Sequence, residues 1–115
     1  MCKSSRGEKK IISFLKNENI QYFSQFKFDE CKNKNKLPFD FYLPNHNICI
    51  EFQGEQHYHP IPYFGGEDKL KKVKKRDQIK RNFCKNNLIK LIEIPYWDRC
   101  CIFKILKENI YYEKT

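Results

Sequence analysis

Apolar residues recur along the chain with two different periods, which predict alternating helices and strands. A period near 3.6 marks helices, and strict alternation or a short apolar run marks strands. The expected elements are a helix that opens in residues 4–8 and ends at 17–19, strands over 20–28, 39–43, 48–53 and 88–94, a long helix over 67–86, and a last helix carrying Ile102, Phe103, Leu106 and Ile110. Residues 29–36 are polar and rich in lysine, so we expect a loop there.

Local signals support several of these boundaries. Ser5 and Glu8 have the spacing of a capping box at the first helix. Residues 44–47 (PNHN) have the composition of a hairpin turn between two strands, and Asp98 is an expected N-cap for the last helix. The order α-β-β-β-α-β-α predicts an α/β fold, with helices covering a mixed sheet, in a single domain over residues 1–115.

Acidic and amide side chains alternate with apolar ones on two of the expected strands. Glu51 and Gln53 point to one face of their strand, and Ile50 and Phe52 point to the other. A hairpin would bring Asp40, on the preceding strand, across the ladder from Glu51 and Gln53. We therefore expect these three polar side chains to cluster.

Two carboxylates inside an aromatic-rich sheet are costly to bury as ions. A divalent cation would offset that cost, because Mg²⁺ takes oxygen ligands and is often held by one or two protein carboxylates. The same alternation also occurs on the solvated face of a half-exposed strand. The spacing alone therefore leaves both interpretations open.

The charge balance favours an anionic partner. Lys and Arg number 23 against 14 Asp and Glu, a formal net charge of +9. Such a field attracts nucleic acid, although a basic composition also suits a merely soluble surface. The expected phosphate contacts on the long helix are Lys69, Lys72, Lys75, Arg76, Lys80 and Arg81.

Membrane and secreted classes fit the sequence poorly. No apolar run approaches the roughly 20 residues that span a bilayer. A basic membrane-surface protein would need an amphipathic helix with bulky aromatics, which we do not find. The six cysteines form no C-x-x-C pair and no secretory signal precedes them, so we expect reduced thiols in an intracellular protein of the cytoplasm or nucleus.

The segment around the acidic cluster resembles a known enzyme core. It reads LPFDFYL over residues 37–43 and, after a short turn, ICIEFQG over residues 48–54. This pattern is similar to the PD-(D/E)xK nuclease core, also called the restriction-endonuclease-like fold. Glu8 resembles the acidic residue that the family carries on its first helix. The GEQHY segment at 54–58, the helix around Asp77 and Lys80, and the IPY segment at 94–96 resemble a subgroup related to very-short-patch-repair and homing-type endonucleases. The likeness covers roughly residues 5–97.

The resemblance implies an αβββαβ(α) core and a Mg²⁺- or Mn²⁺-dependent endonuclease that cleaves DNA, with RNA as the alternative substrate. Asp40 and Glu51 would bind the metal, the main-chain carbonyl of Phe52 would complete the shell, and Glu8 would add a ligand or orient a water. Such a metal lowers the pKa of a bound water and neutralises charge on the phosphate. A protein this small has little surface for base readout, so a homodimer is one expected arrangement.

One position departs from the family pattern. The usual motif lysine is Gln53 here, and an amide carries no positive charge and exchanges no proton. Lys80 and Lys90 are the candidate substitutes.

His57 has two interpretations, a proton donor or phosphate contact and an exposed loop residue.

Two alternatives remain beside the nuclease reading. In the first, the nuclease fold is kept as an inactive nucleic-acid-binding module, with Gln53 marking the loss of activity. In the second, His46, Asn47 and His57 would form an H-N-H type metal site, but the Pro- and Gly-rich loop after His57 does not directly supply the required helix.

Overall fold

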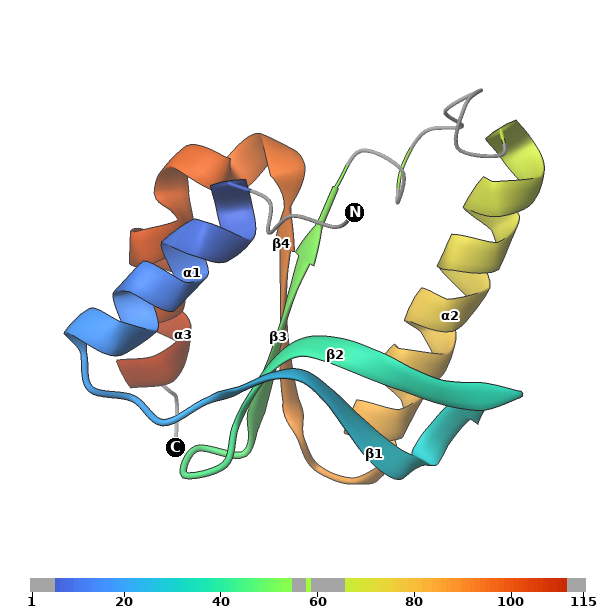
Figure 1. Cartoon of the computed structure of the whole chain (residues 1–115), viewed down its shortest axis with the longest axis horizontal. Coiled ribbons are helices and arrows are strands. Elements are labelled where there is room, and N and C mark those ends of the chain that lie inside the picture. Colours follow the sequence, from blue (N-terminus) through green and yellow to red (C-terminus); the bar gives the residue numbers. More distant parts are fainter. Residues whose placement is uncertain (1–5, 55–57, 59–65, 112–115) are drawn as a thin grey trace.

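The described part of the chain folds in the predicted order of helices and strands, and it also contains a 3₁₀ segment before the last helix (Figure 1). The structure is a computed structural model that describes residues 6–54, 58 and 66–111. Its elements are α1 (Arg6–Asn17), β1 (Phe23–Asn33), β2 (Asn35–Leu43), β3 (Ile48–Gln53), α2 (Gly66–Asn86), β4 (Lys90–Pro95), the 3₁₀ helix η3 (Tyr96–Cys101) and α3 (Ile102–Tyr111).

The strands form one mixed sheet in the order β1-β2-β3-β4. The first three are antiparallel neighbours, and β4 pairs parallel to β3 after the crossover through α2. Helices α1 and α3 lie together beside one face of the sheet, and α2 lies on the other side (Figure 1). The predicted α/β class, a mixed sheet flanked by helices, is confirmed.

An apolar core lies between the sheet and the helices on each of its two faces. The core under α1 and α3 includes Ile11, Leu15, Phe41, Ile50 and Leu106. A smaller core under α2 is built from Cys31, Leu37, Phe39, Cys49 and Cys84. The cysteines in the described ranges are all free thiols, and three of them serve here as small apolar residues.

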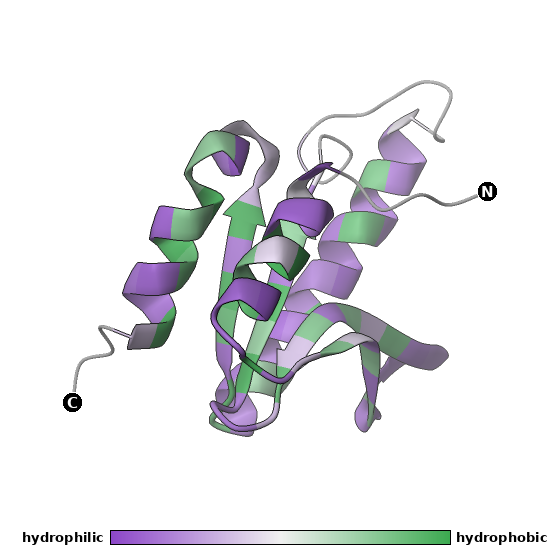
Figure 2. Ribbon diagram, turned by 60° about the vertical axis from the view of Figure 1, so that its left-hand side comes forward, coloured by the Kyte–Doolittle hydropathy of each residue, from purple (hydrophilic) through white to green (hydrophobic). Residues whose placement is uncertain are grey.

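The outer layer at α2 is strongly polar. Hydrophilic residues cover most of this helix, whereas the central strands alternate between hydrophilic and hydrophobic positions (Figure 2). Within the described ranges, no helix combines the length and apolar character needed to cross a membrane.

The prediction of a loop over residues 29–36 is wrong. These residues continue β1 and begin β2. Lys34 makes the turn between the strands at a φ of 71°, and the pairs Asn33–Asn35 and Lys32–Lys36 follow it in the ladder. An exposed ion pair of 2.8 Å between Lys36 and Asp29 spans the two strands of the hairpin. Polar composition therefore marked an extended, solvent-exposed hairpin rather than a loop.

The predicted start of the last strand at Leu88 is also wrong. Leu88 adopts a φ of 58° and is 87% exposed, because it belongs to the turn that follows the end of α2 at Asn86. The N–H of Ile89 donates to the carbonyl of Cys84 at 2.9 Å, the 6→1 bond of a Schellman ending. The strand therefore begins only at Lys90.

Asp98 does not cap the last helix as predicted. It lies inside η3 at φ −97° and ψ 16°, and η3 begins after Pro95 without a side-chain cap. These non-helical values mark a kink within η3, and α3 begins only at Ile102, so Asp98 does not occupy the N-cap position of that helix.

Strands β2 and β3 separate at the position that carries the acidic residues. Their ladder runs from Leu43–Ile48 to Phe41–Ile50 and then ends, although both strands continue. At this point β2 bends toward α2 while β3 stays paired with β4 (Figure 1). The bend moves Phe39 into the α2 core, whereas Phe41 stays in the opposite core.

Helix α1 approaches the sheet through a glycine. A Cβ added at Gly7 would overlap ring carbons of Phe52, the β3 residue beside the separated strands. We predict that Gly7→Ala destabilises the fold by about 1–3 kcal/mol, because the ring must move within a packed core. In an unhindered helix the same change would stabilise by up to about 1 kcal/mol, so the sign of the change is informative.

Denaturant unfolding of Gly7→Ala, Phe52→Leu and the double variant measures this contact. The double variant is expected to be less destabilised than the sum of the two single variants, because a smaller side chain at position 52 leaves room for the added methyl group. A Gly7→Ala protein that is more stable than wild type would show that α1 does not rest on the Phe52 ring.

Candidate active site

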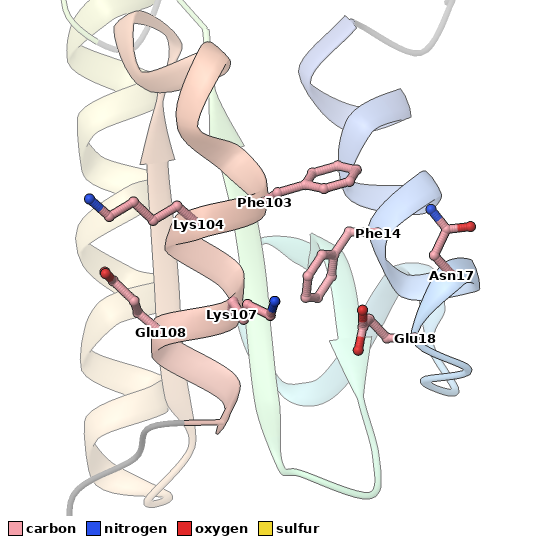
Figure 3. Close-up of a pocket in the computed structure, with 7 residues that line it drawn as sticks. All are labelled: Phe14, Asn17, Glu18, Phe103, Lys104, Lys107 and Glu108. Carbon is pink, nitrogen blue, oxygen red and sulfur yellow. The ribbon is translucent and has the colours of Figure 1, made fainter.

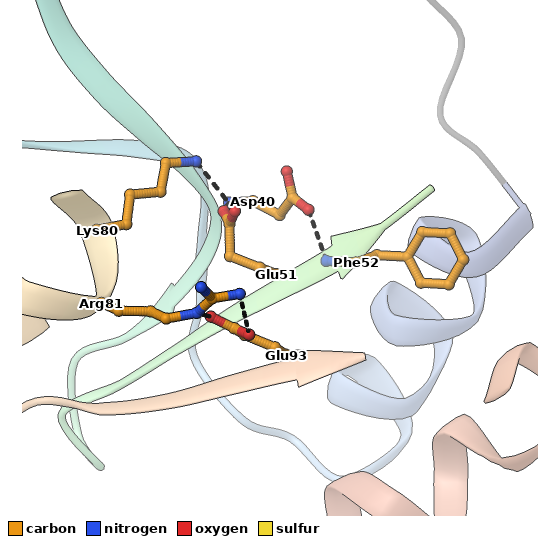
Figure 4. A network of polar contacts seen from close by, with 6 residues as sticks. All are labelled: Asp40, Glu51, Phe52, Lys80, Arg81 and Glu93. Carbon is orange, nitrogen blue, oxygen red and sulfur yellow. Dashed lines mark hydrogen bonds and ion pairs between the residues drawn. The ribbon is translucent and has the colours of Figure 1, made fainter. Parts of the chain in front are cut away.

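Asp40 and Glu51 meet where β2 and β3 separate, and each carboxylate accepts a hydrogen bond from the other strand. The N–H of Asp40 donates to Oε2 of Glu51 at 2.8 Å, and the N–H of Phe52 donates to Oδ2 of Asp40 at 2.8 Å. The side chains thus bond main-chain groups beyond the end of the ladder. The structure brings these two predicted site residues together (Figure 4).

The Glu51 carboxyl is held in a proton-retaining environment. Its residue is 4% exposed. Burial, followed by the nearby charge of Asp40, raises the pKa of Glu51 to about 7, against the opposing effect of Lys80 and the Asp40 N–H. A titratable group perturbed in this way, beside a second carboxylate, is a recognised feature of functional sites.

Lys80 supplies the positive charge at this site. Its Nζ lies 3.0 Å from Oε1 of Glu51, and the lysine side chain is only 13% exposed. The same ammonium sits 5.3 Å from the ring centroid of Phe39, within cation–π range. Of the two lysines proposed from the sequence, only Lys80 is at the carboxylates, because Lys90 donates to the carbonyl of Asn109 at 2.7 Å.

Gln53 lies on the Glu51 face of β3 but has a separate contact. It is 2% exposed, and its Oε1 accepts a hydrogen bond from the hydroxyl of Tyr58 at 2.5 Å. A buried amide with its own hydroxyl partner is well satisfied. Tyr58 was not predicted as a site residue, since nothing in the spacing links it to Gln53.

A second charged pair lies one strand away from the first. Glu93 on β4 is in register with Glu51 on β3. Its carboxylate accepts one hydrogen bond from Nε of Arg81 at 2.7 Å and another from a second guanidinium nitrogen at 3.1 Å. Figure 4 shows Lys80 and Arg81 reaching from α2 to these two carboxylates. Sequence reasoning missed Glu93, although it stands between Ile92 and Ile94 much as Glu51 stands between Ile50 and Phe52.

Of the other two predicted catalytic residues, Glu8 is described by the structure and His57 is not. Glu8 is half-buried in the first turn of α1, which Gly7 brings to the Phe52 side chain. His57 lies outside the described residues, as does the expected Ser5 cap. His46 is exposed in the turn before β3, at the far end of that strand from Gln53. Among the residues described, no group of three His, Cys, Asp or Glu side chains is arranged to hold a metal.

The basic residues of α2 have different surroundings. Lys80 and Arg81 pair with Glu51 and Glu93, whereas Lys72 and Lys75 are exposed. Lys69, Arg76 and Lys80 line a cleft of about 420 Å³ between α2 and the β1–β2 hairpin, which we call the hairpin cleft. Only part of the predicted set of phosphate contacts therefore lines the hairpin cleft.

A different hollow of about 380 Å³ lies between α1 and α3. Phe14 and Phe103 meet there edge to face with ring centroids 5.5 Å apart, and charged side chains surround them (Figure 3). It is lined by none of the predicted site residues and lies on the opposite layer from α2. We therefore do not assign it to the candidate active site.

The pH dependence of folding tests the environment of Glu51. Its pKa of about 7 in the fold exceeds the ordinary 4.5, so the folded state binds the proton more tightly. This stabilisation is complete below about pH 4.5 and is lost as the pH rises through 7, a change of about 3 kcal/mol. We predict that Glu51→Gln flattens the fall in unfolding free energy between pH 5 and 8.

Urea unfolding at several pH values measures this slope for both proteins. The attraction to Lys80 acts on the ionised carboxylate and is already part of that pKa, so the difference in slope between the two proteins reports the Glu51 proton. Parallel curves for wild type and variant would contradict the buried, proton-retaining environment.

Comparisons with known proteins show relatives among viral proteins. No family model matches the chain, and no solved structure matches it significantly. Uncharacterized protein 307L of Invertebrate iridescent virus 6 is 32% identical over 113 residues, covering 82% of this chain and 57% of that protein. Uncharacterized protein 033L of Invertebrate iridescent virus 3 is 30% identical over 96 residues, covering 80% of this chain and 50% of that protein.

A third relative matches a shorter stretch. Uncharacterized protein 094L of Frog virus 3 (isolate Goorha) is 44% identical over 62 residues, covering 52% of this chain and 40% of that protein. The chain thus spans about half the length of these curated relatives. Their names carry no activity, so a functional proposal has to rest on the geometry of this chain.

Proposed function

We propose that the protein is a metal-dependent nuclease with a restriction-endonuclease-like core, hydrolysing phosphodiester bonds of DNA in preference to RNA. The observation that carries the proposal is the pairing of Asp40 and Glu51 at the point where β2 and β3 separate. Two carboxylates fixed at a break in the sheet, with a lysine beside them, fit the sequence resemblance to the PD-(D/E)xK core. The proposed shell consists of Asp40, Glu51 and the Phe52 carbonyl, with Glu8 as an additional ligand.

The donor set fits a hard divalent cation. Carboxylate and carbonyl oxygens are the ligands of Mg²⁺ and Mn²⁺, and Mg²⁺ needs only one or two carboxylates when water and phosphate complete the shell. The pKa of about 7 at Glu51 shows that its negative charge is incompletely balanced in the fold. When bound, the ion would activate a water and neutralise charge on the scissile phosphate.

Lys80 takes the role that the motif lysine would have at position 53. Its ammonium already lies at the carboxylates, and its four-carbon side chain lets it turn from Glu51 to an incoming phosphate. There it would stabilise the negative charge that grows on the phosphate in the transition state. Gln53, which lies on the same face of β3 as Glu51, would position Tyr58 through its hydrogen bond to the hydroxyl of that residue.

The net charge of +9 and the basic wall of the hairpin cleft support a nucleic-acid substrate. A second candidate function is the inactive binding module. It is favoured by one observation, the burial of Gln53 and its bond to Tyr58, which gives this residue a purely structural partner. Cleavage assays separate the two functions.

We predict metal-dependent cleavage of nucleic acid by the wild-type protein. Asp40→Asn and Glu51→Gln keep the size of each side chain and should lower the cleavage rate by about 10²-fold or more, because they remove ligand charge. Plasmid, single-stranded DNA and RNA with Mg²⁺ or Mn²⁺ are the substrates, with EDTA as the metal-free reaction.

Glu93→Gln is the matched control, since Glu93 is in register with Glu51 on the adjacent strand and pairs with Arg81. It should cleave within about threefold of wild type, because a partly exposed ion pair contributes little to folding. Binding without cleavage by wild type, under every metal condition, would leave only the binding-module function.

The role of Lys80 has its own test. Lys80→Met should lower the maximal cleavage rate by about 10²–10³-fold, because the transition state loses its positive partner. Lys80→Arg should recover part of that rate because it restores the charge.

Mn²⁺ titration distinguishes a catalytic role from a structural one. Removing the ammonium beside Glu51 should leave metal affinity unchanged or higher, since a competing cation is gone. A Lys80→Met protein that cleaves at the wild-type rate would exclude Lys80 from the reaction. Weaker metal binding in that variant would indicate that Lys80 only maintains the site.

A further inference from the structure

We propose that one unpaired nucleic-acid strand reaches the carboxylates through the hairpin cleft between α2 and the β1–β2 hairpin. This inference rests on the proposed function and names the form of its substrate. The first observation is the position of Lys80, which lines the cleft and also lies 3.0 Å from Glu51. A chain seated in the cleft would therefore extend directly toward the candidate active site.

The charges on both walls suit a phosphodiester backbone. Helix α2 contributes Lys69, Arg76 and Lys80, and the hairpin contributes Lys36 from the opposite side. Lys36 is paired with Asp29, but both side chains are well exposed, at 51% and 79%. Such a pair is weak and can give way to a phosphate. The acidic residue in the lining, Asp77, is buried, so cations dominate the rim.

The interior of the cleft contains apolar surface that the bases of a nucleic acid could contact. Leu37, Pro38 and Val73 provide apolar surface between the basic walls. Asn33 and Asn35 add amide groups, which can donate to and accept from exposed base edges. Proteins that bind single strands with little sequence preference combine a basic groove with surfaces on which bases stack, most often aromatic rings. This cleft supplies the basic walls, and its apolar surface is aliphatic.

The size of the cleft argues for one strand. Its volume of about 420 Å³ is comparable to pockets of roughly 300–1,000 Å³ that hold one small ligand. This space accommodates about one separated nucleotide at a time, the size of one small ligand, and not a double helix. The hairpin and α2 also pack together through the core that includes Cys31, Leu37 and Cys84, and β2 bends toward that helix (Figure 1). Paired bases would have to open before their backbone entered.

The test measures binding without cleavage. Fluorescence anisotropy in EDTA gives dissociation constants for a labelled single-stranded DNA, the same sequence in RNA, and the matching DNA duplex. We expect at least one of the two single strands to bind at least fivefold more tightly than the duplex. Comparing DNA with RNA shows which sugar the cleft accepts.

A charge-matched pair of variants locates the bound strand. Lys69→Ala/Arg76→Ala removes two exposed cations of the cleft, and Lys71→Ala/Lys74→Ala removes two exposed cations elsewhere on the same helix. At about 100° per residue, Lys71 and Lys74 lie on the far side of α2 from the cleft pair. The cleft variant should bind single strands at least tenfold more weakly, and the control less than threefold.

Salt dependence provides an independent reading of the same contacts. Loss of two phosphate contacts should reduce the slope of log K against log salt by about 1.4 for a single strand. The control variant should keep more of the wild-type slope.

Equal losses in the two variants, duplex binding as tight as both single strands, or absence of binding would overturn the inference. Cleavage of a duplex by wild type with no preference for single strands would overturn it while leaving the nuclease function intact. Cleft-dependent strand binding with no cleavage in Mg²⁺ or Mn²⁺ would support the cleft and overturn the nuclease function.

Discussion

The separation of β2 from β3 is the constraint on which the rest of the site depends. Beyond the end of their ladder, the N–H groups of Asp40 and Phe52 are bonded by the carboxylates of Glu51 and Asp40. Partly buried main-chain donors need such partners, because leaving them unbonded is costly. The same two acidic residues therefore hold the strands in place and, under the proposed function, would also bind the metal. Their orientation is fixed by the backbone that they satisfy.

This arrangement also explains why so basic a helix packs against the sheet. Near Cys84 the contact between α2 and the sheet is apolar, through Cys49 and the surrounding core. About one turn earlier, Lys80 and Arg81 face Glu51 and Glu93. Buried carboxylates need nearby positive charge, and α2 supplies it at the register where β3 and β4 carry acidic residues. Part of the positive charge of this helix thus compensates the sheet, and only the remainder faces solvent and the hairpin cleft.

The sequence was most informative where local pattern decides structure. Alternation placed Glu51 on β3, and the hairpin turn placed Asp40 opposite it, as found. Residues 29–36 were missed because all of them except the buried Cys31 are polar, so their composition resembled a loop. Glu93 was missed because the parallel register of β3 and β4 depends on the crossover through α2, which no short-range signal reveals. Tyr58 and the choice between Lys80 and Lys90 likewise depend on contacts between distant segments.

The position of Gln53 changes which residue matters most for the proposed chemistry. In the family pattern a lysine at this position would supply the positive charge, and its replacement by an amide argues against activity. In the fold, however, Gln53 is buried and bonded to Tyr58, while an ammonium from α2 lies beside Glu51. The charge is therefore present at the carboxylates but comes from a helix instead of β3. Because that helix also forms one wall of the hairpin cleft, under the proposed function one element would bind the strand and supply the cation.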